Sequence, residues 1–69
     1  MQVELTEHEK DILKLIFAGD SNKEIAQKLS MNENTIKLHV SKLYEKYGVS
    51  GEKNARIRLI VQCFRSKSL

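Results

Sequence analysis

The residues SNKEIAQKL at positions 21–29 and NTIKLHV at positions 34–40 decide the fold of this chain. Ser21 and Glu24 have the spacing of a capping box, in which a serine and a glutamate three residues later satisfy each other's backbone amides at a helix start. Asn32 is a good N-cap residue ahead of the other segment. The two stretches therefore predict two short helices joined by a tight turn.

Two further helices are expected on either side of this pair. Thr6 and Glu9 form another capping box before an apolar run of helical spacing, and Gly19 and Gly48 stand where left-handed C-terminal caps are expected. Strict alternation of apolar and polar residues is absent, so no strand is predicted. We expect an all-α, four-helix bundle-like single domain over residues 1–69, with helices at about 7–18, 22–29, 33–47 and 51–64 and a helix-turn-helix at about 23–42.

Composition limits the class of protein. The chain has 69 residues and one cysteine, Cys63, which excludes an intrachain disulfide and a cysteine-based zinc site. No apolar run approaches the ~20 residues that cross a membrane. The first 20 residues carry two lysines against five acidic residues, whereas residues 51–69 carry five basic residues against Glu52. This asymmetry fits a polyanionic partner, and we expect a cytoplasmic, nucleoid-associated protein.

One face of the expected helix 33–47 has the composition of a surface that reads DNA. On a helical wheel the core stripe consists of Ile36, Val40, Leu43 and Tyr47. The opposite face carries Asn34, Lys37, Leu38, Ser41 and Glu45, with Lys42 beside them. Lysine can reach guanine or phosphate oxygens, and leucine can pack on a thymine methyl, as a helix in the major groove requires. Periodicity alone fits a solvated amphipathic helix equally well.

The candidate DNA contacts fall into two groups. Base edges are within the chemistry of Asn34, Lys37 and Leu38, and small Ser41 would let the helix approach the groove. Contacts to the phosphate backbone are expected from Asn22, Lys23, Thr35, Lys42 and Lys46.

The chain resembles the LuxR/FixJ-type, GerE-like helix-turn-helix family of bacterial transcriptional regulators over nearly all of residues 5–60. The matching positions are Leu5-Thr6, Glu9, Ile12-Leu13, Gly19, the stretch 21–26, Leu29, the stretch 35–37, His39-Val40, Lys46 and Gly48-Val49. The resemblance implies sequence-specific binding of double-stranded DNA, with the third of four helices as the recognition helix. It also implies base contacts at Lys37, Leu38 and Ser41, in agreement with the wheel.

Three positions depart from the family pattern. His8 and Glu52 stand where arginine is usual, and Ser41 stands where some members have lysine. We expect the fold to tolerate these changes and the preferred DNA sequence to differ. Since family members often carry a receiver or ligand sensor ahead of this domain, the chain is interpreted as either a stand-alone regulator or a C-terminal effector domain.

The expected fourth helix has two apolar faces. Ile57, Ile60, Val61 and Phe64 lie on one side, and Ala55, Leu59 and Cys63 lie on the other. A domain of this size has one core, so we expect one face to pack internally and the other to meet a partner. The stripe of three is predicted to form a homodimer on DNA, and the resemblance also implies pairing through this helix. The alternative is that the stripe packs on the first helix or stays partly exposed.

No enzyme chemistry is indicated. His8 and His39 are the only histidines and lack the spacing of metal ligands, and the carboxylates near residue 9 lie at a helix start, where the helix dipole favours them. We therefore expect no catalytic residue, metal, cofactor or small-molecule ligand. The rival interpretations are a protein-interaction module that contacts another regulator or RNA polymerase through the same fold, and a nonspecific nucleoid binder.

Overall fold

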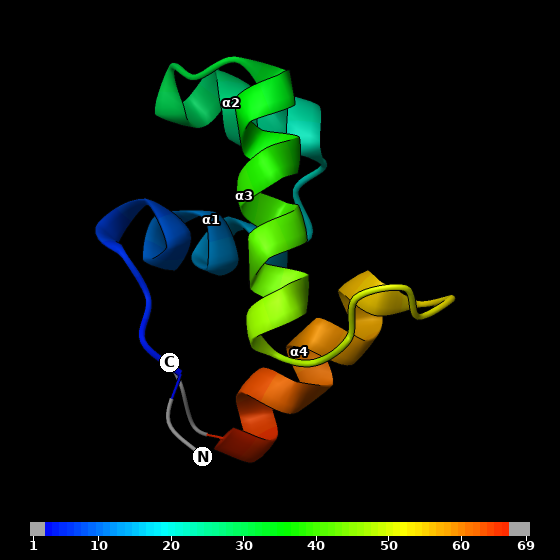
Figure 1. Cartoon of the computed structure of the whole chain (residues 1–69). Coiled ribbons are helices and arrows are strands. Elements are labelled where there is room, and N and C mark those ends of the chain that lie inside the picture. Colours follow the sequence, from blue (N-terminus) through cyan, green and yellow to red (C-terminus); the bar gives the residue numbers. More distant parts are fainter. Residues whose placement is uncertain (1–2, 67–69) are drawn as a thin grey trace.

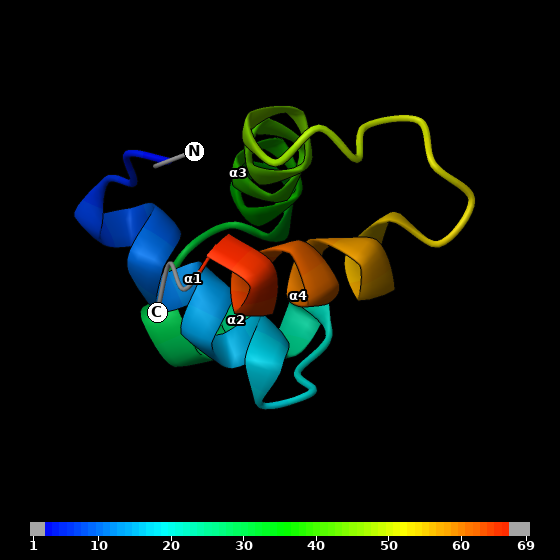
Figure 2. The same cartoon turned by 90° about the horizontal axis from the view of Figure 1, so that it is seen from below.

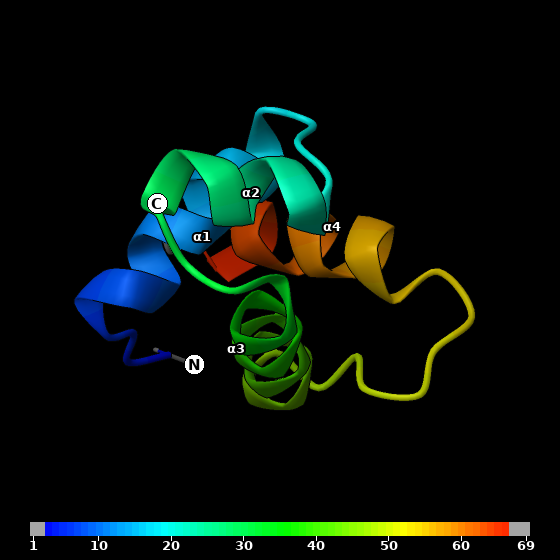
Figure 3. The same cartoon turned by 90° about the horizontal axis from the view of Figure 1, so that it is seen from above.

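The computed structural model describes residues 3–66, which fold into four helices and contain no strand. α1 spans Glu7–Phe17, α2 spans Asn22–Leu29, α3 spans Glu33–Lys46 and α4 spans Ala55–Ser66. The predicted all-α class and the first three helices are confirmed. α3 stands on one side of the other three helices (Figures 1 and 2). Seen nearly end-on, α3 lies beside the group formed by α1, α2 and α4 (Figure 3).

Both predicted capping boxes are formed. The Thr6 amide donates to Glu9 Oε1 at 2.9 Å, and the Glu9 amide donates to Thr6 Oγ1 at 3.2 Å. Ser21 and Glu24 make the same pair of bonds at 2.8 and 3.2 Å. Each box satisfies amides that the first turn of a helix leaves without an intrahelical partner, so it defines where α1 and α2 begin.

Glycines end α1 and α3 in the same way. Gly19 has φ of +90° and Gly48 has φ of +71°, a left-handed conformation that costs glycine little because it has no Cβ. The residue after each glycine donates to the carbonyl five residues earlier, at 3.0 and 2.9 Å. These bonds form Schellman motifs, which satisfy helix-end carbonyls and turn the chain sharply.

The fourth helix differs from its prediction at both ends. It begins at Ala55, not residue 51, and it continues past Phe64 to Ser66. Gly51 has φ of +81°, so it belongs to a turn and cannot open a right-handed helix there. The first helical bond runs from the Arg58 amide to the Asn54 carbonyl at 2.9 Å.

The core contains side chains from all four helices. The buried hydrophobic residues are Ile12, Leu13, Ile16, Ile25, Ala26, Ile36, Val40, Leu43, Tyr47, Val49, Leu59 and Cys63. The core stripe predicted for α3 is confirmed, because every member of it is in this set. Within the described part of the chain, no helix has the length and hydropathy of a membrane span.

Candidate nucleic-acid interface

The link between α2 and α3 is a tight turn built from local hydrogen bonds. Ser30 has φ of 54°, a left-handed conformation that is uncommon for a residue other than glycine. The Met31 amide donates to the Ala26 carbonyl at 2.9 Å and closes the end of α2. Asn32 then opens α3, its side-chain oxygen accepting from the Asn34 amide at 2.8 Å. The end of one helix and the start of the next therefore lie only a few residues apart.

The outer face of α3 brings together most of the residues predicted to contact DNA. Leu38 is 64% exposed although it is a large apolar side chain. The other exposed members of this face are Asn34, Lys37, Ser41 and Lys42, and Thr35 is half-buried at its edge. An exposed leucine among amide, ammonium and hydroxyl donors can contact both the polar edges and the methyl groups of bases.

Lys37 is held only weakly by its protein partner. Its ammonium lies 3.8 Å from the Glu33 carboxylate one turn earlier, and the two side chains are 59% and 44% exposed. An exposed pair with this spacing contributes about 0.3–0.5 kcal/mol at most. A charge-assisted bond to a guanine or a phosphate is stronger, so Lys37 loses little by leaving Glu33.

The start of α2 is tied to α4 by an arginine that the sequence analysis did not single out. Arg56 donates to Asn22 Oδ1 at 2.9 Å and to the Asp20 carbonyl at 2.7 Å. Half-buried Asn22 keeps two amide donors for a further partner, and neighbouring Lys23 is exposed. The sequence carries no sign of this role, since Arg56 is one of several basic residues in its segment.

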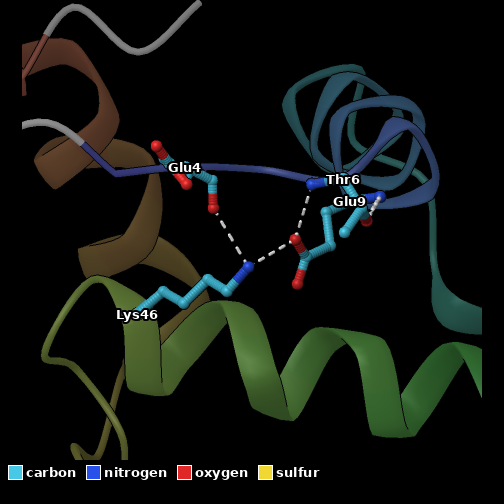
Figure 4. A network of polar contacts seen from close by, with 4 residues as sticks. All are labelled: Glu4, Thr6, Glu9 and Lys46. Carbon is cyan, nitrogen blue, oxygen red and sulfur yellow. Dashed lines mark hydrogen bonds and ion pairs between the residues drawn. The ribbon is translucent and has the colours of Figure 1, made fainter.

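Lys46 does not belong to the outer face of α3, which corrects its predicted phosphate contact. Its ammonium lies 2.6 Å from Glu9 Oε1 and donates to the Glu4 carbonyl at 3.0 Å (Figure 4). A pattern read along one helix could not identify this partner, because Glu9 lies on α1. Its charge therefore ties α3 to α1.

The carboxylate of this ion pair is buried and ionised. Glu9 is only 3% exposed, and burial alone would raise the pKa of its carboxyl. Hydrogen bonds from Lys46 and Thr6, together with the charge of Lys46, outweigh burial and hold the Glu9 pKa below its ordinary value. One carboxylate thus completes the cap of α1 and anchors the far end of α3.

The structure reverses the two faces predicted for α4. Leu59 is 0% exposed and Cys63 is 2% exposed within a single chain, and Ala55 is half-buried. Assigning these three residues to a dimer interface is therefore corrected: in a single chain the stripe packs inward. Burial raises the pKa of the Cys63 thiol, against a hydrogen bond with Tyr47 that lowers it. This thiol is a core side chain.

The opposite face of α4 is exposed and apolar. Ile57, Val61 and Phe64 are 64%, 43% and 72% exposed. The Phe64 ring stacks on Phe17 of α1, with ring centres 5.7 Å apart and planes inclined by 14°. We call Ile57, Val61 and Phe64 the α4 patch. A wheel could identify two apolar stripes, but only packing against α1 and α3 shows which of them remains outside.

A tight α2–turn–α3 unit that presents a polar and basic face of its second helix defines a helix-turn-helix domain. The chain belongs to the luxR family of bacterial regulatory proteins, whose family model matches residues 3–59. The family resemblance noted from the sequence is thereby confirmed. Helix-turn-helix domains of this family bind DNA and regulate transcription.

Two curated relatives agree with the family. The chain is 43% identical over 51 residues to the HTH-type transcriptional regulator MalT of Vibrio campbellii (strain ATCC BAA-1116). It is equally similar to the protein of the same name in Vibrio parahaemolyticus serotype O3:K6 (strain RIMD 2210633). In both cases the match covers 74% of this chain and 6% of the relative, so the likeness concerns a small part of those proteins. No solved structure gives a significant match.

Proposed function

We propose that this domain binds double-stranded DNA sequence-specifically, with α3 in the major groove. The observation that carries the proposal is the outer face of α3, where exposed Leu38 is flanked by exposed Lys37, Ser41 and Lys42. Lys37 would hydrogen-bond a guanine edge, and Leu38 would pack on a thymine methyl. Ser41 is small and so would not hold the helix away from the bases.

Backbone contacts would place α3 in the groove. Lys23 at the start of α2 and Lys42 on α3 are exposed cations that can each meet a phosphate oxygen. Half-buried Thr35 lies in the first turn of α3, where helix amides favour an anion. Asn22, held by Arg56, would donate through its free amide hydrogens. These contacts would position the domain and make its affinity depend on salt.

We also propose that two copies pair on DNA through the α4 patch. A single chain leaves Ile57, Val61 and Phe64 exposed along one side of the helix. A twofold contact between such patches would bury both at once, because a C2 interface uses the same surface on each copy. The resulting dimer could present two copies of α3 to successive major grooves. As the proposed dimer contact, the α4 patch replaces the stripe of Ala55, Leu59 and Cys63.

A binding titration tests the proposed role of Lys37. Selection from a random duplex library at near-physiological salt would first supply the preferred site, which we expect to be an inverted repeat. Lys37→Ala should then weaken binding to that site by about 1–3 kcal/mol, or roughly 5- to 150-fold. Lys14→Ala is the matched control, since exposed Lys14 lies on α1 outside the proposed interface.

The outcomes separate the rival functions. Equal affinities for the Lys37 and Lys14 variants would refute base reading by Lys37. Retention of DNA without an enriched motif would indicate a nonspecific binder with mainly phosphate contacts. No retained DNA would favour a protein-interaction module instead.

A further inference from the structure

The two histidines of the chain meet in the folded domain. His8 lies on α1 and is exposed, and His39 lies on α3 and is half-buried. Their ring centres are 5.9 Å apart, and the ring planes are inclined by 64°. The sequence shows no ligand spacing for these histidines because the packing of α1 against α3 creates the pair.

The backbone around this pair is held in place independently of the rings. His8 is next to Glu9, and His39 lies about two helical turns before Lys46, on the same side of α3. The 2.6 Å ion pair between Glu9 and Lys46 therefore fixes the register of the two helices beside the histidines. The rings are brought together by the fold itself.

Two neighbouring imidazoles on separate helices have the chemistry of a metal site. Imidazole is the commonest protein ligand for transition metals. With metal–nitrogen bonds of about 2.0–2.1 Å, two imidazoles on one tetrahedral ion have ring centres about 5 Å apart. The observed separation of 5.9 Å is close to this value.

We propose that His8 and His39 bind a divalent transition-metal ion of the class that prefers imidazole, such as Zn²⁺ or Ni²⁺. The described residues hold no cluster of three or more His, Cys, Asp or Glu suited to a metal, so water completes the coordination. The ion bridges α1 and α3. The unfolded chain does not hold the two rings together, so binding favours the folded state. This proposal does not depend on the proposed DNA-binding function.

Calorimetric titration of the whole chain with Zn²⁺ and with Ni²⁺ tests the site. We expect saturable binding of one ion per chain and a melting temperature that rises with metal concentration. His8→Arg should lose both effects, and so should His39→Gln. Asp11→Asn is the matched control, because it removes an exposed α1 carboxylate near His8 and should leave metal binding unchanged. Circular dichroism checks that each variant is folded.

Magnetic resonance of the imidazole rings gives a readout that does not depend on stability. The ring signals of His8 and His39 should shift together as metal is added, with one titration midpoint. Binding retained by the His8→Arg variant would overturn the proposal. It would also be overturned if only one ring responded, because the ion would then be held by a single histidine or by another group.

Discussion

Leu59 and Ile57 lie two positions apart on α4 and have opposite environments. Leu59 is fully buried in the core of one chain, whereas Ile57 is largely exposed. Replacing each with alanine tests which face of α4 supports the fold. If the stripe of Ala55, Leu59 and Cys63 formed a dimer contact, as the sequence predicted, the result would be reversed. Leu59 would then be dispensable for the folded monomer.

The expected costs differ enough to be separated. Leu59→Ala loses the transfer free energy of the removed carbons and leaves a cavity, which together cost about 2.7–5 kcal/mol at well-packed sites. Domains are stable by about 0.05–0.15 kcal/mol per residue, which for a chain of this size is only roughly 3–10 kcal/mol. Ile57→Ala loses little burial and gains helix propensity, so its change should stay within about 0.5 kcal/mol.

Urea unfolding followed by far-ultraviolet circular dichroism measures both variants. Several protein concentrations should be compared, because dimerisation would add to apparent stability. In a thermal scan followed by the same signal, Leu59→Ala should lower the melting temperature by roughly 4–8 °C for each kcal/mol lost. A Leu59→Ala variant as stable as the parent, or an Ile57→Ala variant that loses as much stability as Leu59→Ala, would refute the assignment of Leu59 to the core and Ile57 to the surface.

Three further perturbations follow from the structure. Lys46→Met should cost about 1–3 kcal/mol, because the buried Glu9 carboxylate loses its partner while partial exposure of Lys46 reduces the effect. The pKa of Glu9 is lowered on folding from its ordinary value of about 4.5, so the contribution of this carboxylate to stability is present above that value and is lost as pH falls through the folded value. The stability gap between parent and Lys46→Met should therefore shrink in urea titrations taken from about pH 6 to about pH 3, and a constant gap would contradict this account. Ser30→Gly should raise the unfolding free energy by up to about 1 kcal/mol, because glycine adopts the left-handed conformation at φ 54° more readily, and a decrease would show that the serine side chain has another role. Val61→Glu should leave monomer stability nearly unchanged and prevent pairing on DNA, which sedimentation of the complex would show, whereas an intact dimer would exclude the α4 patch.

Several features of the fold could be predicted because they rest on neighbours in the chain. Thr6 with Glu9, and Ser21 with Glu24, meet within one helical turn, so residue type and spacing suffice to locate a helix start. The exposed face of α3 follows from helical geometry in the same way. The family then connected that face with DNA, which periodicity by itself did not.

Prediction of the candidate site was incomplete where a residue's partner is distant in sequence. Lys46 was expected to meet phosphate, but its partner is Glu9 on α1. Arg56 was not noticed, and it holds Asn22 at the start of α2. In each case the role of one charged residue among several depends on a contact with another helix, and only the packing of the helices creates that contact.

The sequence by itself determined the first three helices, their caps and the polar face of α3, because hydrogen bonds and side-chain spacing within five residues specify them. Tertiary structure decided which apolar face of α4 is buried, since Leu59 and Ile57 both belong to apolar stripes. Only the surfaces that α1 and α3 present to α4 distinguish those stripes. The same packing brings His8 to His39 and Glu9 to Lys46, because these pairs join helices whose relative placement no local rule contains.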